Sequence, residues 1–518
     1  MGYFRAAVCA ALLLFATPQV APAQDVSLSS PDGAVEITGN LLGFDGEFYR
    51  VETKFGELTV DGSGVSCEGP GCPSLSDFVA EITLSGSSSM AEVLLPALIE
   101  GFALRNGYKT RRDSLGNGHF EYVLLRDQNR PAARFSFFVN NTDQGFADLL
   151  AQEADMVMAL REIRPAEKKL AREAGMGDMT RSSRSRIVAL DALVPVVAQE
   201  NPVQRISLPQ LAAIFSGGIQ NWQSLGGPDA PISLHVPVPG SGLTQAFEDR
   251  LLLPAGVSFS SNLRHYDRGS ALVRRVATDP FAIGITSFAE VGTARMLTLT
   301  GSCGFSLRAN RRSIKTEDYP LTAPMFLYLP ERRQAKVARD FLAYIRGPGA
   351  QIVIRRAGFV DQAPERISLN RQGDRLSNAI QAAGPEVELA ELQRLVTGLS
   401  GLRRLTTSFR FETGSARPDA QSRSNIEQLA RALEAGVYDG WALTFVGFSD
   451  GEGAASGNRQ IALKRAKFVR DAVQKMAETT GVDRVDLRVE AFGEALPMAC
   501  DDSAWGRKVN RRVEVWVQ

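Results

Sequence analysis

Residues 82–102 read ITLSGSSSMAEVLLPALIEGF and contain the pattern that decides the fold of the central part of the chain. A short apolar run ends at a glycine among serines, and an amphipathic segment follows it. Apolar side chains recur in that segment at the spacing of one helical face, at Ala91, Leu95, Leu98 and Phe102. The pattern therefore predicts a strand, a polar loop and a helix in succession.

The serines of this loop, Ser87, Ser88 and Ser89, allow two interpretations. Serine is a favoured helix N-cap, and one hydroxyl would be enough for that purpose. Several hydroxyls beside the exposed N–H groups of a helix also make a neutral cradle for an anion. We expect the loop to serve as both a cap and one half of an anion site.

Outward from this loop, the chain of 518 residues divides into several predicted domains. Residues 78–365 alternate strands and helices, as an α/β domain does. Residues 24–77 predict a small β-rich module. Residues 366–402 predict a charged helical connector, and residues 403–518 show a second α/β pattern. The fold class is therefore α/β multidomain.

Composition limits the partners and the chemistry. Lysine plus arginine number 58, and aspartate plus glutamate also number 58. This balance gives no excess of positive charge that would favour binding to nucleic acid or an anionic membrane. The 3 histidines have no metal-ligand spacing, so we expect no metal site and no cofactor. Neither serine-rich loop carries Gly-x-Ser-x-Gly, and potential catalytic bases are few. A serine hydrolase ranks below binding functions, and we expect no catalytic residue and no enzyme.

The N-terminal residues predict export. Arg5 precedes the apolar run 6–15, and Ala21-Pro22-Ala23 is typical of a cleavage site, so residues 1–23 are interpreted as a signal peptide. No later segment has the length of a membrane helix. We expect a protein without a membrane span in the periplasm.

Export also bears on the cysteines. Cys67 and Cys72 bracket Glu-Gly-Pro-Gly, a turn-forming sequence, and predict a local disulfide. Cys303 and Cys500 lie in different predicted domains, and the sequence assigns them no pairing.

Three motifs in residues 78–365 resemble the periplasmic phosphate-binding proteins of ABC transporters. They are the Ser85–Met90 loop, the run NPVQRISLPQLAAIFSGGIQNWQSLGG at 201–227, and PGSGLTQAFEDRL at 239–251. The resemblance implies a clamshell of two lobes that closes on phosphate or a related oxyanion. It also implies an ABC permease as a partner.

The same resemblance assigns ligand-binding roles. It places Ser87, Ser88 and Ser89 on one side of the oxyanion and Ser241 and Gly242 on the other. Helix capping alone remains open for each serine.

Several positions depart from the family at this site. Pro237 and Leu243 stand where relatives carry Arg and Thr. Ala159 and Leu160 replace a Ser-Ser pair, although Arg161 remains and is a candidate ligand. Each charged hydrogen bond lost from a dry site costs about 1.5–3 kcal/mol. The departures therefore favour an alternative, a wall-anchored scaffold or sensor whose clamshell no longer binds phosphate.

The stretch FVGFSDGEGAASGNRQIALKRAKFV, from Phe445, resembles the peptidoglycan-binding domain named after OmpA. The matching positions are Asp450, Gly453, Asn458 and Arg465. A carboxylate and a guanidinium set apart can bind the ammonium and carboxylate of one amino acid. The resemblance implies that this ligand is diaminopimelate in the wall peptide, with Asn458 orienting the loop. An Asp–Arg surface pair of little energetic weight is the alternative.

The combined interpretation is an exported solute-binding protein that captures phosphate or a similar oxyanion. Its C-terminal domain would hold it non-covalently at the peptidoglycan, associated with the cell wall and near the outer membrane.

Overall fold

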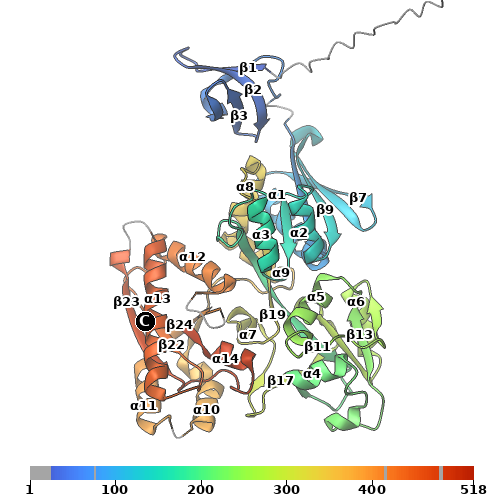
Figure 1. Ribbon diagram of the computed structural model, residues 1–518, viewed down its shortest axis with the longest axis vertical. Coiled ribbons are helices and arrows are strands. Elements are labelled where there is room, and N and C mark those ends of the chain that lie inside the picture. The colour runs from blue at the N-terminus through green and yellow to red at the C-terminus, as the bar shows by residue number, and fades with distance from the viewer. Residues whose placement is uncertain (1–24, 75–77, 385, 413–416, 478–481) are drawn as a thin grey trace, which may run out of the picture. The chain divides into compact units, whose positions relative to one another are not determined.

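The computed structural model describes residues 25–74, 78–384, 386–412, 417–477 and 482–518, and the interpreted signal peptide lies outside them. The chain forms two compact units, one of residues up to Ala80 with 333–337 and one of the remainder (Figure 1). Within the described residues, no helix has both the length and the apolar character needed to cross a membrane.

The N-terminal unit is an antiparallel sheet of order β4-β3-β2-β1-β5. Its strands are β1 (Asp25–Ser29), β2 (Glu36–Phe44), β3 (Phe48–Thr53), β4 (Gly56–Asp61) and β5 (Ser66–Glu68). Val26, Leu28, Tyr49 and Val51 fill its core. Cys67 and Cys72 are joined by a disulfide, as the turn between them predicts.

The first lobe of the larger unit is built on one end of an 11-stranded sheet. Its strands are β6 (Ala80–Ser87), β7 (Lys109–Gly116), β8 (His119–Leu125), β9 (Pro131–Asn140) and β10 (Met156–Ala159). Its helices are α1 (Leu95–Arg105), α2 (Thr142–Leu150), α3 (Pro165–Glu173), α8 (Lys336–Ile345) and α9 (Pro348–Arg356). The predicted strand, loop and helix of residues 82–102 correspond to β6, a short π-helical turn and α1.

The second lobe occupies the other end of the sheet. Its strands are β13 (Ser233–Pro237), β14 (Arg264–Tyr266), β15 (Ala282–Ser287) and β16 (Arg295–Met296), and a small sheet adds β12 (Arg205–Ser207), β17 (Thr298–Thr300) and β18 (Ser306–Leu307). Its helices are α4 (Leu208–Phe215), α5 (Gly242–Phe247), α6 (Gly269–Ala277) and α7 (Arg311–Lys315).

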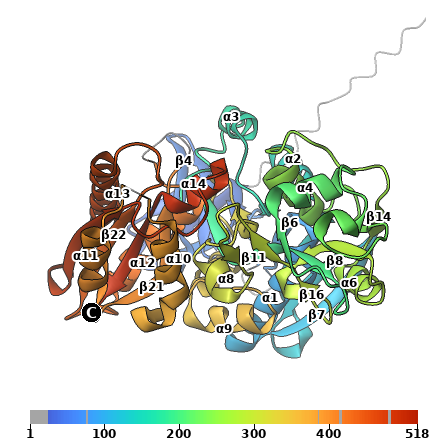
Figure 2. The same ribbon diagram turned by 90° about the horizontal axis from the view of Figure 1, so that it is seen from below.

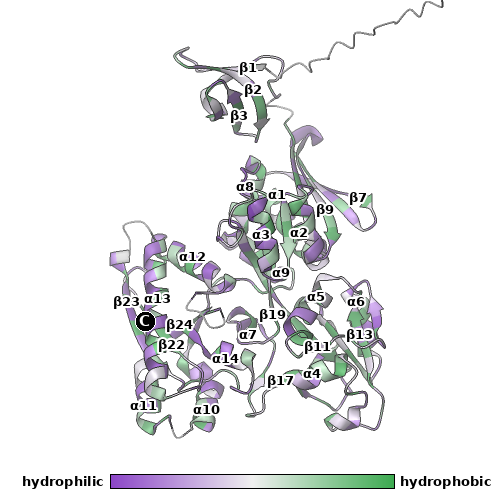
Figure 3. Cartoon of the chain, in the orientation of Figure 1, coloured by the Kyte–Doolittle hydropathy of each residue, from purple (hydrophilic) through white to green (hydrophobic). Residues whose placement is uncertain are grey.

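Two strands connect the lobes. β11 (Ser185–Val197) pairs along its first part with β19 (Thr322–Tyr328) and along its last part with β15 of the second lobe. Residues of β11 from Val188 to Leu190 and from Ala192 to Val194 are fully buried. Figure 3 shows these central strands in hydrophobic colours, whereas helices such as α13 carry hydrophilic residues. The crossing strands hold the two lobes on a shared apolar core.

The C-terminal domain is a sheet of order β20-β21-β24-β22-β23. Its strands β21 and β22 are labelled in Figure 2. Its strands are β20 (Arg366–Ser368), β21 (Arg403–Arg410), β22 (Ala442–Phe448), β23 (Asp486–Gly493) and β24 (Arg512–Val517). Its helices are α10 (Gly373–Ala382), α11 (Leu389–Leu399), α12 (Ala420–Glu434), α13 (Ala455–Met476) and α14 (Ala504–Asn510). A Cβ on Gly447 of β22 would overlap the carbonyl of Ala462, so glycine lets α13 lie against the sheet.

The segment 366–402 is more than a connector. Its β20 pairs with β21, and Leu395 and Leu399 of α11 pack with Phe448 and Trp516 of the sheet. Helices α12 and α13 contribute to a separate apolar cluster with Phe445 and Val515. Because side chains alternate along β22 and β24, the two clusters cover opposite faces of one sheet. The segment therefore supplies the second apolar layer of the C-terminal domain.

Candidate functional site

The serine loop follows β6 at the boundary between the lobes. Gly86 has a φ of +131°, and a Cβ there would overlap the carbonyl oxygen of Met158 on β10. Glycine is therefore required for the chain to turn at this point. The next residue, Ser87, is 0% exposed, and its Oγ has no hydrogen-bond partner among the described residues. A buried hydroxyl without a partner is costly, which makes Ser87 a candidate for a ligand contact.

Ser88 and Ser89 are half-buried. Ser89 stands at the N-cap position of the first turn, Met90–Leu94, but its side chain makes no capping hydrogen bond. Ser207 and Ser241, in contrast, cap α4 and α5 through their hydroxyls. The prediction that a loop serine caps its helix by a side-chain bond is therefore wrong, and these hydroxyls are not committed to the helix.

The Gly240–Gly242 loop of the second lobe lies against the serine loop. A Cβ on Gly242 would stand 2.7 Å from Ser87 Oγ and 3.1 Å from Leu160 Cδ1. Ser241 Oγ accepts from the Thr244 N–H at 3.2 Å and donates to Thr244 Oγ1 at 2.9 Å, so its hydroxyl serves the α5 cap. The structure thus brings Ser87 and Gly242 together and gives Ser241 a capping role.

Apolar side chains occupy part of this region. Leu160 is 1% exposed and Leu243 is 7% exposed. Leu160 Cδ1 lies beside Gly242 together with Ser87 Oγ, and this aliphatic side chain offers no hydrogen-bond donor there.

Arg161 has partners that compete with an anion. Its Nη1 lies 2.9 Å and its Nη2 2.7 Å from the Glu167 carboxylate, and Nη2 also pairs with Asp143. The guanidinium is only 8% exposed. Its four terminal N–H donors therefore face carboxylates and a backbone carbonyl. Carboxylates therefore compete with an anion for the terminal nitrogens, whereas the buried Nε has no hydrogen-bond partner among the described residues. The role of Arg161 as an oxyanion ligand stays a prediction.

The adjacent Arg164 connects the lobes. Its Nη2 lies 3.0 Å from Asp249, which belongs to the second lobe, and its Nη1 lies 3.1 Å from Asp143 of the first. These ion pairs link the two lobes. The sequence offers no signal for them, since a charged residue does not indicate its distant partner.

Two carboxyl groups in the connecting region have raised pKa values. Burial raises the pKa of Asp191 on β11 to about 6, although Ser287 Oγ donates to it at 2.6 Å. Burial also raises the pKa of Glu290, and the charges of Asp191 and Glu92 add to the shift. Neither residue was singled out from the sequence.

The candidate wall-binding site lies where β22 ends and α13 begins. Asp450 is 9% exposed in its side chain, and Arg511 Nη1 donates to Asp450 Oδ2 at 2.7 Å. Arg465 lies on α13 with its Cζ 5.3 Å from the centroid of the Phe411 ring. Burial and the nearby Arg511 lower the pKa of Arg465, while Asp450 opposes them. The three charged groups therefore lie near one another.

The structure leaves Arg465 with no carboxylate partner among the described residues, whereas Asp450 is paired with Arg511. A zwitterionic amino acid could place its carboxylate on Arg465 and its ammonium on Asp450. Arg511 is the partner of Asp450 that the sequence analysis did not identify.

The loop around this site is fixed by amide and carboxylate groups. Asn458 Nδ2 donates to Glu494 Oε2 at 2.6 Å, and the Gly451 N–H donates to Asp501 Oδ2 at 2.8 Å. Burial raises the pKa of Glu494, with Asp501 and Asp450 among the charges that add to the shift. Asn458 thus binds a neighbouring acid rather than standing free.

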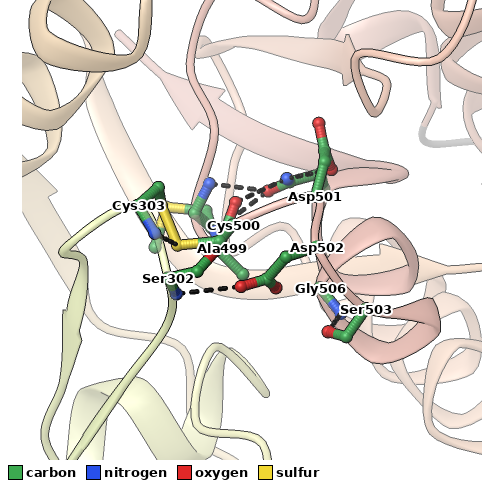
Figure 4. The surroundings of a disulfide bond; sticks show 10 residues. Ser302, Cys303, Ala499, Cys500, Asp501, Asp502, Ser503 and Gly506 are labelled. Atoms are coloured by element: carbon green, nitrogen blue, oxygen red, sulfur yellow. Dashed lines mark hydrogen bonds between the residues drawn. A yellow bond between two sulfur atoms is a disulfide. The ribbon is translucent and has the colours of Figure 1, made fainter. Parts of the chain in front are cut away.

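A disulfide joins Cys303 of the second lobe to Cys500 beside this loop (Figure 4). Asp502 accepts from the Ser302 N–H at 2.8 Å, which adds a polar contact between the same two segments. The sequence left these cysteines unassigned because their positions in different domains gave no indication of proximity. Among the described residues, no group of His, Cys, Asp and Glu is arranged to hold a metal ion.

Comparison with known proteins assigns the two larger domains to families. The profile of the PBP superfamily domain matches residues 73–347, and that of the OmpA family matches residues 410–511. Protein SphX of Synechococcus elongatus is 28% identical over 43% of this chain and 67% of its own length. The phosphate-binding protein PstS of Bacillus subtilis is 26% identical over 35% of this chain and 60% of its own length.

For the C-terminal part, the probable lipoprotein YiaD of Escherichia coli is 30% identical over 20% of this chain and 45% of its own length. An ABC-type phosphate transport receptor from Vibrio cholerae is a solved structure with 20% identity and a TM-score of 0.42, covering 54% of this chain and 99% of its own. The profile matches confirm the two resemblances read from the sequence. The chain belongs to the PBP superfamily and carries an OmpA family domain at residues 410–511.

Proposed function

We propose that this chain is a solute-binding protein of the periplasm that captures phosphate or a closely similar oxyanion between its lobes. The OmpA family domain would tether it non-covalently to diaminopimelate-containing peptidoglycan, and an ABC permease would receive the solute. On this proposal, residues 78–365 capture the solute and residues 403–518 bind the wall. Relatives named as phosphate-binding proteins support the class of ligand.

One observation carries the proposal for the cleft. Ser87 Oγ is buried and without a partner, and it faces Gly242 of the opposite lobe. An oxyanion that accepted from this hydroxyl, and from Ser88 and Ser89 beside it, would satisfy the unpaired donor. The N–H groups at the start of α5 would supply donors from the other lobe. The ligand would enter after the Arg164–Asp249 pair opens.

The test is calorimetry on the full chain, freed of bound ligand by exhaustive dialysis. We expect one-to-one binding of phosphate, with sulfate as the comparison anion. Ser88→Ala with Ser89→Ala should abolish it, while Ser207→Ala, which removes a hydroxyl that only caps α4, should leave affinity unchanged. Absence of phosphate binding by the unaltered chain would overturn the proposal for the cleft.

A scaffold or sensor function is the second candidate. It is favoured by Leu160, whose Cδ1 lies against Gly242, and by the carboxylates that pair with the terminal nitrogens of Arg161. Lobes that are linked by their own ion pairs and apolar contacts need no anion between them. In that case calorimetry would detect no phosphate binding, and peptidoglycan sedimentation of the full chain would remain positive.

A further inference from the structure

A second cavity, away from the serine loop, lies between the clamshell and the C-terminal domain. Its volume is about 610 Å³, which falls within the range of about 300–1,000 Å³ typical of small-molecule sites. It is lined by β11, β19, α8 and α9 on one side and by α12 on the other. Both sides belong to the same compact unit of the chain.

The wall of this cavity is largely aliphatic. Its aliphatic lining residues include Ile187, Val188, Leu327, Leu342, Ile345 and Leu429. All are less than 9% exposed on the whole molecule, so they are packed into the surrounding core. Such a lining favours an aliphatic chain over a polar solute.

The cavity lining carries more positive than negative side chains. Four arginines line it, Arg186, Arg346, Arg366 and Arg431, and Glu427 is its one acidic residue. Glu427 pairs with Arg431 and lies 3.5 Å from Arg346. Arg366 stacks on the ring of Trp441. Arg186 therefore has no carboxylate partner in the described part of the chain.

Arg186 is half-buried and poorly provided with hydrogen-bond partners. A long hydrogen bond of 3.4 Å runs from its Nε to the Ser183 carbonyl. Burial lowers its pKa to about 10, and the charges of Arg346 and Arg431 add to the shift. A guanidinium placed among aliphatic groups and like charges is destabilised unless an anion joins it. The terminal nitrogens of Arg186 are free to donate to such an anion.

We propose that this cavity binds a free fatty acid of medium chain length, with the carboxylate on Arg186 and the aliphatic chain along the β11 and α12 walls. The site is independent of the serine loop and of its oxyanion. It would join the solute-binding lobes to the C-terminal domain through one ligand, because both contribute lining residues. Binding would then stabilise the contact between the two domains.

The experiment titrates dodecanoate into the full chain below its micelle concentration, with dodecanol as a probe of equal chain length and no charge. We expect one-to-one binding of dodecanoate and binding of dodecanol weaker by about tenfold or more, as the loss of a charged hydrogen bond implies. Arg186→Met should weaken dodecanoate by a similar factor and leave dodecanol unchanged. Arg312→Met is the matched control, since this exposed arginine lies outside the cavity lining.

A second variant tests the apolar wall. Ala432→Trp would fill the cavity from α12 at a half-buried position and should prevent both probes from binding. Failure of dodecanoate to bind, equal binding of dodecanol, or unchanged affinity in Arg186→Met would each overturn the proposal. Tighter binding of a lysophospholipid than of dodecanoate would overturn the assignment to a free fatty acid.

Discussion

Cys303 and Cys500 form a disulfide between residues 197 positions apart, and it links the second lobe directly to the C-terminal domain. Cys500 precedes Asp501, which accepts a hydrogen bond from the Gly451 N–H next to Asp450. The covalent link therefore ends at the loop that positions the candidate wall-binding carboxylate.

Removal of this disulfide should destabilise the larger unit. A cross-link stabilises mainly by reducing the chain entropy of the unfolded state, and loss of a native one costs about 2–5 kcal/mol, more for long loops. We expect Cys303→Ser with Cys500→Ser to lower the melting temperature measured by scanning calorimetry. The double variant Cys67→Ser with Cys72→Ser is the control, because its sequence separation is only 5. An equal shift in both variants, or none in the first, would contradict this expectation.

The sequence predicted those parts of the fold that rest on local patterns. Neighbouring residues determine the Gly86 turn and the alternation of Phe445, Val446 and Phe448 along β22. Strands, loops and the two resembled domains could therefore be recognised. Pairings between distant segments could not be recognised from the sequence. Nothing near Cys303 indicates Cys500, and nothing near Arg164 indicates Asp249.

The helical segment 366–402 shows the same limit. Leu389 and Leu395 are both apolar residues of α11, but Leu389 is 69% exposed and Leu395 is 0% exposed. A stripe predicts that a helix buries one face, but the surface it meets determines which residues lie in the contact. Here that surface is the far side of the C-terminal sheet, around Phe448 and Trp516.

Ser87 should affect binding and stability in opposite directions. Its Oγ has no partner, so Ser87→Ala removes an unsatisfied hydroxyl and should leave the melting temperature unchanged or higher. The same change should weaken phosphate binding by about tenfold or more if the oxyanion accepts from this group. Ser85→Ala is the contrasting variant, because Ser85 donates to Asp148 and should lose stability. Loss of stability in Ser87→Ala with unchanged affinity would refute the assignment.

Asp191 should make stability fall as pH rises from about 4 to 6. Burial raises its pKa to about 6 in the folded chain from the ordinary value of 3.8, so the folded state holds the proton more tightly than the unfolded state. That stabilisation is complete below the unfolded value and is lost as pH passes through the folded value. Asp191→Asn removes the titration and should be more stable than the unaltered chain above pH 6. Urea unfolding at pH 4 and pH 7 measures the difference.

A pH-independent difference between Asp191→Asn and the unaltered chain would contradict this account. Asp178→Asn is a useful comparison, because hydrogen bonds from Thr180 lower the pKa of Asp178. Asp178→Asn should therefore lower the free energy of unfolding at pH 7 and leave it unchanged in acid. The two variants should therefore show pH dependences of opposite sign.

Removal of Arg465 and removal of Asp450 should affect the stability of the fold differently. Arg465 has no carboxylate partner to lose, so Arg465→Met should retain the melting temperature and reduce the fraction of protein that sediments with peptidoglycan. Asp450→Ala should reduce sedimentation as well. It also removes the hydrogen-bond acceptor of Arg511, and a lost charged hydrogen bond costs about 1.5–3 kcal/mol of stability. Lys467→Met, an exposed change on the same helix, should affect neither measurement. Normal sedimentation of Arg465→Met would show that the Asp450–Arg511 pair is a structural ion pair and that this end of α13 does not bind the wall.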